Sequence, residues 1–235
     1  MLVDTHCHFS SFYSVDSDRL LLDVDSTLSH LGKTSTNSHK IGLGLHPWFV
    51  DDQSLLKLYS VDEFAWQAAS LIAEIGLDFS PAFRQTRLLQ LEAFNYQLAL
   101  ANRFNKPVSL HLVKSYQPMF EFLSCYHLKG AIHGFSGSVN EAVRFYKLGF
   151  RIGVNGLILR ENTPKYRCLV DSMPLEALVL ETDYPNIVYP DGRPADSMQL
   201  LRIAQRIAQI KSLSVERVIA ITNQNAMESF NLVSL

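Results

Sequence analysis

The chain has 235 residues, of which 47% are hydrophobic and 19% charged, so it can bury a substantial core and is not a disordered chain. The formal net charge of −2 excludes an overall basic field for nucleic acid, although bound cations can supply positive charge locally. Three widely spaced cysteines argue against a disulfide framework and favour a reducing compartment. We find no apolar run of about 18 residues that would span a membrane and no signal sequence, and we expect a cytoplasmic protein.

Short apolar segments alternate with longer segments of helical periodicity along the chain. The clearest helix covers residues 83–104, and Ser138 with Glu141 forms a capping box that starts another. This alternation predicts a parallel sheet with right-handed crossovers. About eight such units predict an α/β fold of the (β/α)8 TIM-barrel type, somewhat distorted and compact, with one domain over residues 1–235. Strands are predicted at residues 2–8, 19–24, 41–45, 71–75, 108–111, 131–133, 150–154 and 178–181, and helices at residues 60–70, 83–104, 116–126, 138–148, 166–170, 197–211 and after 214.

The first predicted strand carries a His-x-His motif. Successive side chains of a strand point to opposite faces, so His6 and His8 share one face while Cys7 points to the other. Two imidazoles about 7 Å apart on one strand face can bind one divalent metal ion. The motif alone fits equally well with one exposed histidine and one hydrogen-bonded core histidine. The metal interpretation therefore depends on ligands from elsewhere in the chain.

Further candidate ligands lie at the ends of other predicted strands. Glu74, His111 and His133 are near the ends of three strands, and Asp183 just follows the last one. The carboxyl ends of the strands of a parallel barrel converge on one mouth, so we expect these side chains to meet. Taken singly, Glu74 fits a paired core carboxylate, His111 a strand-end cap and Asp183 a turn residue. Their shared placement favours a metal site.

Short motifs occur in a characteristic order from residue 4 to residue 230. They are Asp4-Thr-His-Cys-His8, Gly44-Leu-His-Pro-Trp48, Glu74-Ile-Gly-Leu-Asp78, Arg84-x-x-Arg-x-x-Gln-x-x-Ala-Phe94, Lys106-Pro-Val-x-x-His111, His133-Gly-Phe-Ser-Gly137, Glu181-Thr-Asp-Tyr-Pro185 and Asn225-Ala-Met-Glu-Ser-Phe230. Together they resemble the TatD-type metal-dependent deoxyribonucleases of the amidohydrolase-like superfamily. No single motif is specific, but the ordered set is.

The resemblance implies two divalent metal ions, Mg²⁺, Mn²⁺ or Zn²⁺, as cofactors. Two metals roughly 3.5–4 Å apart can clamp both the attacking and the leaving oxygen atoms of a phosphodiester. The implied ligands are His6, His8 and Asp183 for the first ion, His111 and His133 for the second, and Glu74 as the bridge between them.

The resemblance also assigns roles around the metals. Asp183 would accept a proton from the attacking water, which makes Asp183 and Glu74 the implied catalytic residues. His46 would contact the scissile phosphate or complete the metal environment. An arginine that the family carries near this site is replaced by the offset and less specific Lys114, and residues 192–196 also depart from the family pattern. The metal centre is complete, whereas the substrate-binding rim is altered.

The implied function is hydrolysis of phosphodiester bonds by a metal-dependent deoxyribonuclease or exonuclease, with DNA single strands or ends as the partner. The segment after His8 is compact, so the first crossovers are shortened. With the altered rim, two alternatives stay open. One is a hydrolase of another small phosphoester, lactone or amide. The other is a nuclease-like subunit of a larger complex with protein partners, for example in anti-phage defence.

Aromatic residues flank the predicted mouth of the barrel. They would either stack on nucleic-acid bases or pack the loops onto the barrel rim. Among the predicted substrate contacts, Phe135 joins His46 and Lys114. The full aromatic set is Phe9, Phe12, Tyr13, Trp48, Phe135 and Tyr184.

Overall fold

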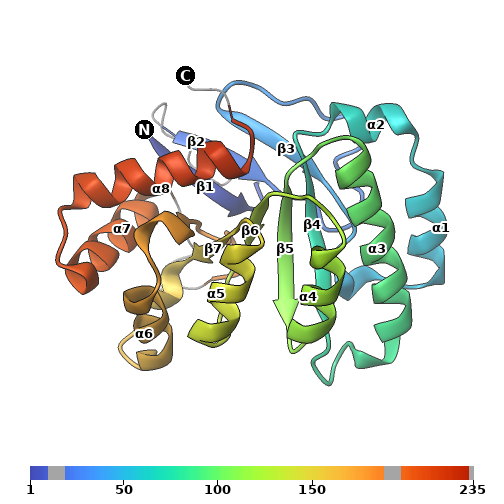
Figure 1. Cartoon of the computed structure of the whole chain (residues 1–235). Helices are drawn as coiled ribbons and strands as arrows, with labels where there is room; N and C mark the ends of the chain where they lie inside the picture. The colour runs from blue at the N-terminus through green and yellow to red at the C-terminus, as the bar shows by residue number, and fades with distance from the viewer. Residues whose placement is uncertain (10–18, 188–196, 233–235) are drawn as a thin grey trace.

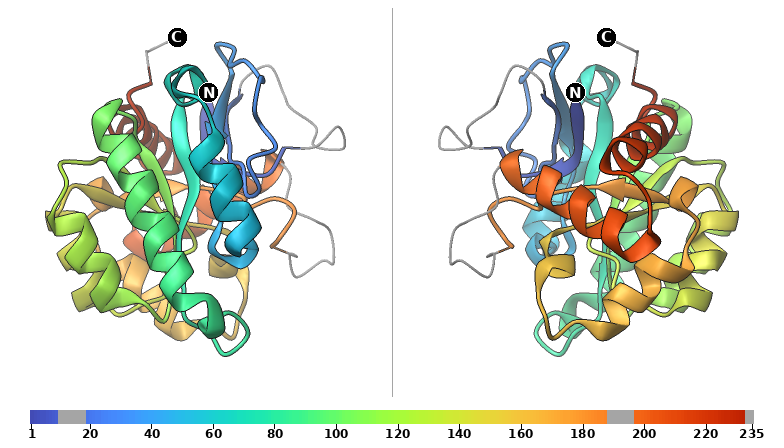
Figure 2. Two further views of the ribbon diagram at one scale, coloured as in Figure 1. Left: turned by 90° about the vertical axis from the view of Figure 1, so that its right-hand side faces the viewer. Right: turned by 90° about the vertical axis from the view of Figure 1, so that its left-hand side faces the viewer.

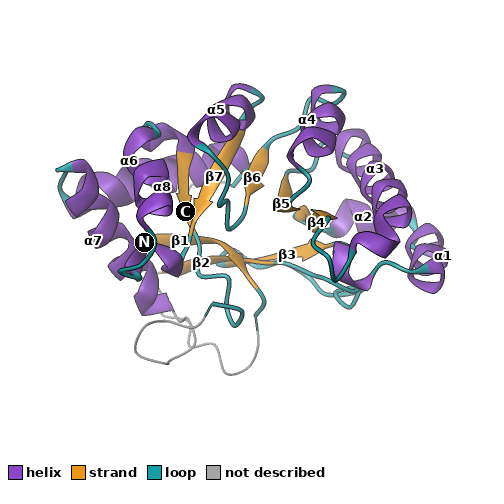
Figure 3. Cartoon of the chain, turned by 90° about the horizontal axis from the view of Figure 1, so that it is seen from below, coloured by secondary structure: helices purple, strands orange, loops and turns teal. Residues whose placement is uncertain are grey.

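Parallel strands form the centre of the molecule, and each is hydrogen-bonded to the next in chain order. The computed structural model describes residues 1–9, 19–187 and 197–232, and eight strands lie in these ranges. Viewed from below, the strands surround a common centre with the helices outside (Figure 3). The predicted (β/α)8 barrel is confirmed. The strands are β1 (Leu2–Cys7), β2 (Arg19–Asp23), β3 (His39–Leu43), β4 (Leu71–Asp78), β5 (Val108–Val113), β6 (Gly130–Ile132), β7 (Phe150–Val154) and β8 (Leu178–Leu180).

Helices cover much of the outside of the barrel (Figures 1 and 2). The described residues between β2 and β3 contain no helix, in line with the expected shortening of the first crossovers. None of the described helices has the length and apolar character needed to cross a membrane. The α-helices are α1 (Asp52–Ser60), α2 (Glu63–Ala68), α3 (Arg87–Arg103), α4 (Tyr116–Ser124), α5 (Val139–Lys147), α6 (Pro164–Ser172), α7 (Ser197–Lys211) and α8 (Val215–Ser229), and the 3-10 helices are η1 (Pro47–Phe49), η2 (Arg84–Thr86), η3 (Gly156–Leu159) and η4 (Leu175–Ala177).

The helix predicted over residues 60–70 is present as the shorter α2 (Glu63–Ala68), whereas α1 (Asp52–Ser60) before it was not predicted. The Asp51 side chain accepts a hydrogen bond from the Ser54 N–H at 2.7 Å and starts α1. The Asp62 side chain accepts one from the Ala65 N–H at 2.9 Å and starts α2. Each carboxylate satisfies a backbone donor that has no partner within its helix. The capping aspartates therefore set the boundaries.

Strand β4 is longer than predicted, which changes the place of Glu74. Its pairing with β5 continues to the end of the strand, where Gly76 lies opposite His111 and Asp78 opposite Val113. Glu74 is consequently in the middle of β4 and not near its end. The register between the two strands shifts between Ile72 and Ile75, so Glu74 lies within an irregular part of the strand.

The barrel closes where the first and last strands meet. Beyond β8, the backbone N–H of Asp183 donates to the carbonyl of His6 at 2.9 Å. The N–H of His8 donates to the carbonyl of Tyr184 at 2.8 Å. These bonds place the chain that leaves β8 directly beside the His-x-His motif of β1.

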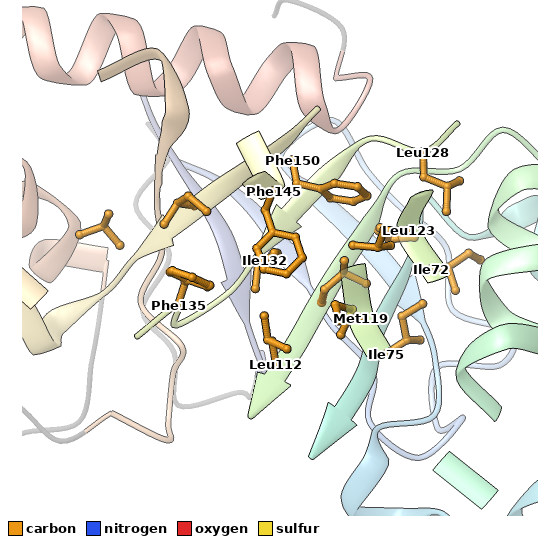
Figure 4. Close-up of a cluster of buried hydrophobic side chains, with 14 of the residues drawn as sticks. Ile72, Ile75, Leu112, Met119, Leu123, Leu128, Ile132, Phe135, Phe145 and Phe150 are labelled. Carbon is orange, nitrogen blue, oxygen red and sulfur yellow. The ribbon is translucent and has the colours of Figure 1, made fainter. Parts of the chain in front are cut away.

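A hydrophobic cluster fills the space between the strands and helices α4 and α5 (Figure 4). Ile72 and Ile132 come from strands, and Leu123 and Phe145 come from the helices. All four side chains are at most 1% exposed. Burying an aliphatic or aromatic side chain of this size contributes about 1.5–3 kcal/mol. The cluster therefore makes a firm support for the strands that carry the polar site.

Candidate metal centre

A buried carboxylate, Glu74, lies at the centre of a group of imidazoles. Its side chain is 3% exposed, and its Oε2 atom is 3.4 Å from Nε2 of His6 and 3.4 Å from Nε2 of His8. Its other oxygen atom has a separate set of neighbours. The nitrogen atoms around Oε1 are His46 Nε2 at 3.1 Å, His111 Nδ1 at 3.2 Å and His133 Nε2 at 2.8 Å.

All the ligands predicted from the sequence are brought together in this cluster. The described residues form three overlapping groups in which possible ligand atoms lie within 4.8 Å of one another. Glu74 belongs to two of these groups, as a bridging carboxylate would. The groups are His6, His8 and Asp183; His6, Glu74 and His133; and His46, Glu74 and His111.

The His6 imidazole has a nitrogen atom suited to a metal ion. Its Nδ1 atom is 2.8 Å from the Ser109 hydroxyl oxygen, whereas Nε2 is buried without a hydrogen-bond partner among the described residues. Burial lowers the pKa of His6 to about 3, so the ring is neutral at physiological pH. A proton on Nδ1, directed at Ser109, leaves the Nε2 lone pair free toward the cluster. The Nε2 lone pair is therefore suited to bind a divalent cation.

Asp183 joins the group of candidate ligands formed by His6 and His8 from the far end of the chain. Its Oδ1 atom is 3.9 Å from Nε2 of both His6 and His8. The same oxygen accepts a hydrogen bond from Asn186 Nδ2 at 3.1 Å, which orients the carboxyl. Burial raises the pKa of Asp183, the direction that suits a group that accepts a proton during a reaction.

The Glu74 carboxylate and the His133 imidazole shift each other's pKa. Burial alone would raise the pKa of Glu74, but the imidazoles of His46, His133 and His6 hold it well below its usual value. Burial alone would lower the pKa of His133, whereas the Glu74 carboxylate raises it to about 10. Without cations, the favoured state is therefore an ionised Glu74 beside a protonated His133. Metal ligands must be deprotonated, so cation binding here would displace that proton.

Asp78 connects the candidate ligand His111 to the wall of the pocket, a role that the sequence analysis did not assign. Its Oδ2 atom is 3.3 Å from His111 Nε2 and accepts a hydrogen bond from Trp48 Nε1 at 2.6 Å. Burial opposes ionisation, but hydrogen bonds from His111, Ser80 and Trp48 hold the pKa of Asp78 below its usual value. A carboxylate at the outer nitrogen of a ligand histidine fixes both its tautomer and its orientation. Asp78 thus leaves His111 Nδ1 facing Glu74.

Two buried glutamines of α3 hold the loops beside the cluster. Gln97 pairs with the backbone of Leu45, accepting from its N–H at 2.7 Å and donating to its carbonyl at 3.2 Å. Gln90 accepts from the N–H of Asp78 at 2.9 Å and donates to the carbonyl of Phe83 at 2.9 Å. Buried polar groups of this kind are usually fully hydrogen-bonded. Helix α3 therefore positions the segments before η1 and after β4.

The cluster opens into a pocket of about 250 Å³. Ser26, Asn186 and Phe49 line this pocket and were not predicted from the sequence as site residues. The lining residues are His8, Ser26, His46, Trp48, Phe49, Glu74, His111, His133, Asp183, Pro185 and Asn186.

Comparison with known proteins agrees with this geometry. A family model described as TatD related DNase matches residues 3–231. The chain belongs to this family. YjjV of Escherichia coli, named as an uncharacterized metal-dependent hydrolase, is 28% identical over 98% of this chain and 98% of its own length. The crystal structure of YjjV gives a TM-score of 0.85 at 27% identity, covering 99% of this chain and 98% of that chain.

Two further TatD-family relatives have names that describe an activity. The human protein named deoxyribonuclease TATDN3 is 30% identical over 97% of this chain and 94% of its own length. An Erwinia amylovora protein named 3'-5' ssDNA/RNA exonuclease TatD is 32% identical over 80% of this chain and 77% of its own length. The predicted family and the prediction of a hydrolase that acts on ester bonds are confirmed.

Two of the predicted substrate contacts do not line the pocket of this TatD-family barrel. Phe135 is 1% exposed and packs edge-on against Tyr116 and Phe145 in the cluster of Figure 4. The chain turns at Gly134, where φ is +52°, and Phe135 lies in the helix layer. Lys114 follows the end of β5, is exposed and does not line the pocket. His46, in contrast, lines it as expected.

The aromatic residues at the barrel mouth divide between the two expected roles. Tyr184 is 8% exposed and packs with Cys7 and Leu21, and the Phe9 ring lies 4.7 Å from that of His39. These two rings pack loops onto the barrel. Trp48 remains 46% exposed in the pocket. Phe12, Tyr13 and the divergent residues 192–196 lie outside the described residues.

We expect Cys7→Ser to retain the metal content and the hydrolysis rate of the wild type. The thiol is fully buried and its sulfur lies 3.6 Å from the carbonyl of Leu22, on the face of β1 opposite the imidazoles. It belongs to none of the possible ligand groups of the described residues. Metal analysis and X-ray absorption of both proteins would check this expectation. A sulfur–metal signal that disappears on substitution would contradict it.

We expect Asp78→Asn to weaken metal binding by about 10–100-fold, the usual effect of losing an outer carboxylate on a ligand histidine. An amide keeps the shape of the side chain but removes the charge that orients His111. Titration with Mn²⁺, followed by electron paramagnetic resonance, would measure the affinity. Asp171→Asn, an exposed position at the end of α6, is the matched control. Equal affinities in all three proteins would show that Asp78 does not position the ligand.

Proposed function

We propose that this TatD-family hydrolase cleaves phosphodiester bonds of DNA at the Glu74 cluster, with two divalent cations as cofactors. The observation that carries the proposal is the division of imidazoles between the two oxygen atoms of one buried glutamate. Cations bound there would polarise the phosphoryl group, lower the pKa of the attacking water and offset charge on the leaving oxygen. Mg²⁺, Mn²⁺ and Zn²⁺ are the candidate ions. The proposed ligands are His6, His8 and Asp183 for one, His111 and His133 for the other, and Glu74 for both.

Asp183 is the proposed general base. Its carboxyl lines the pocket, where it is placed to accept a proton from a water molecule bound beside it. The hydrogen bond from Asn186 occupies part of Oδ1 and holds the group in place. Asp183 therefore serves both as a ligand and as the acceptor of the proton that the attacking water loses.

His46 is the proposed contact to the scissile phosphate. Its Nδ1 atom accepts a hydrogen bond from the backbone N–H of Trp48 at 3.2 Å. A neutral imidazole that accepts at Nδ1 carries its proton on Nε2, and burial lowers the pKa of His46, which favours the neutral ring. The Nε2–H, 3.1 Å from Glu74 Oε1, is then a donor. A donor suits a phosphate oxygen better than a metal ion.

Single-stranded DNA or a DNA end is the proposed form of the substrate. The pocket has a volume of about 250 Å³, just below the usual range of roughly 300–1,000 Å³ for small-molecule sites, which supports a site that takes up a small part of a strand at a time. The names of the relatives TATDN3 and TatD, a deoxyribonuclease and an ssDNA/RNA exonuclease, support the same substrate class.

Incubation of the purified protein with Mg²⁺ or Mn²⁺ and end-labelled DNA tests the proposal. We expect single strands to be shortened faster than the matching duplex, and a chelator to stop the reaction. Metal analysis should give two equivalents per chain. Activity confined to small phosphoesters, lactones or amides would overturn the DNA assignment. Absence of hydrolysis in the metal-replete protein would favour a subunit that acts only within a complex.

A further inference from the structure

Two large aromatic side chains remain exposed in the wall of the pocket. Trp48 and Phe49 belong to η1 and are 46% and 48% exposed. Both line the same pocket as Glu74 and Asp183. Exposed aromatic surface is common on outer helices, but here it adjoins the polar groups of the proposed reaction. These rings are therefore placed to contact the part of a substrate next to the reacting bond.

The two rings differ in what already covers them. Trp48 stacks on Phe83 with ring centroids 5.2 Å apart and an angle of 12°, and its N–H is bound to Asp78 at 2.6 Å. Phe49 approaches His46 at 6.1 Å with a tilt of 59°. Within residues 1–9, 19–187 and 197–232, no aromatic ring is stacked on Phe49. Trp48 is thus fixed, whereas Phe49 has a ring available for stacking.

The charges of the pocket indicate what the Phe49 ring would receive. Neither lysine nor arginine is among the described residues that line the pocket, so none of these side chains offers a cation to the neighbouring phosphates of a polynucleotide. Recognition beyond the reacting phosphate must then use another part of the nucleotide. Nucleobases stack on aromatic side chains whatever their sequence, because every base has a π-face.

We propose that Phe49 stacks on the nucleobase adjoining the scissile phosphate, with Trp48 as the fixed second wall of this subsite. The inference rests on the proposed function, because it assumes a nucleotide in the pocket. The His46 ring neighbours both the Phe49 ring, with centroids 6.1 Å apart, and Glu74 Oε1, at 3.1 Å from Nε2, so a base on Phe49 would adjoin a phosphate bound at His46. A base paired within a duplex is already stacked on its neighbours. The subsite therefore selects unpaired nucleotides.

Kinetics of Phe49→Ala with a single-stranded oligonucleotide test the subsite. We expect KM to rise about 5- to 150-fold, the equivalent of one lost base–aromatic contact of about 1–3 kcal/mol, with kcat unchanged because the contact exists before and during the reaction. Phe49→Trp should restore KM. Phe64→Ala removes a ring that is 79% exposed on α2, away from the pocket, and should behave as wild type.

An oligonucleotide with abasic terminal residues separates stacking from other effects of the substitution. On this substrate, the KM of the wild type should rise by the same factor as it does for Phe49→Ala on normal DNA. The KM of Phe49→Ala should not rise further, because one contact cannot be removed twice. Two results would overturn the subsite and leave the proposed cleavage unaffected. One is an additive increase in KM from the substitution and the abasic substrate, and the other is an equal KM for wild type and Phe49→Ala on normal DNA.

A binding measurement keeps the inference testable apart from activity. The fluorescence of 2-aminopurine, placed as the terminal base, should be quenched on binding to the wild type and to Phe64→Ala but not to Phe49→Ala. If the wild type cleaves no DNA, the proposed function fails, and this quenching alone decides whether the aromatic subsite exists. Equal quenching by all three proteins would overturn it.

Discussion

Glu74→Ala is expected to abolish hydrolysis and to leave the barrel folded. Losing only an outer partner of a ligand costs about 10–100-fold in metal affinity or activity, so loss of the bridge itself should exceed 100-fold. Each of its two oxygen atoms lies beside imidazole nitrogen atoms, and no other described side chain takes this position. Without the carboxylate, His133 loses the group that raises its pKa to about 10. The pKa of His133 should fall, because burial is then opposed only by the weaker effects of Asp183 and Glu181.

Three measurements on Glu74→Ala separate these effects. Circular dichroism checks the fold, metal analysis gives the number of bound ions, and cleavage of labelled DNA gives the rate. Glu121→Ala, at an exposed position on α4, is the matched control and should retain full activity. Wild-type turnover by a folded and metal-replete Glu74→Ala protein would show that the centre is assigned wrongly.

Asp183→Asn should lower turnover by about 10²–10⁴-fold, the usual contribution of a general base. An asparagine keeps the shape and one coordinating oxygen but cannot accept a proton near neutral pH. The carboxyl accepts a hydrogen bond from Asn186, which the new amide oxygen can still accept. We therefore expect the first cation to bind more weakly yet to occupy its site at high concentration.

Turnover of Asp183→Asn at saturating Mn²⁺ distinguishes the two roles of the residue. A low turnover that persists when metal analysis shows full occupancy would support Asp183 as the general base. Full recovery of turnover at saturating Mn²⁺ would show that Asp183 acts only as a metal ligand. Unchanged metal binding and an unchanged rate would show that Asp183 is only a turn residue. Asp171→Asn controls for the general effect of an aspartate-to-asparagine change.

The clustering of the candidate ligands could be predicted from the sequence because a parallel barrel brings strand ends to one mouth. His133 directly follows β6 and Asp183 comes shortly after β8, whereas His111 lies within β5, which continues to Val113. Glu74 joins the cluster for a less direct reason. Its strand continues to Asp78, so the residue is not at a strand end, but a lone carboxylate in an apolar strand was a sufficient signal.

Other features depend on packing that no local pattern encodes. Asp78 and Ser109 reach the ligand imidazoles of His111 and His6 through the arrangement of three strands, which cannot be read from spacing. Phe135 looked like a rim residue because it follows His133 by two positions, but the turn at Gly134 directs the chain toward the helices. An aromatic ring near the mouth of a barrel can either line the pocket or pack among the helices, and only the fold decides between these two places.

The meeting of the first and last strands has a consequence for folding. His6 and His8 precede nearly the whole chain and Asp183 follows most of it, yet all three would hold one cation. Such an ion is a reversible cross-link across a loop of more than 170 residues, and long loops are those whose closure costs the unfolded chain most entropy. Because a ligand that binds only the native state stabilises it by mass action, chelation should free β1 first. Amide hydrogen exchange would then be fastest along the junction of β1 and β8, and the amino-terminal strand would act as the thermal weak point of the barrel.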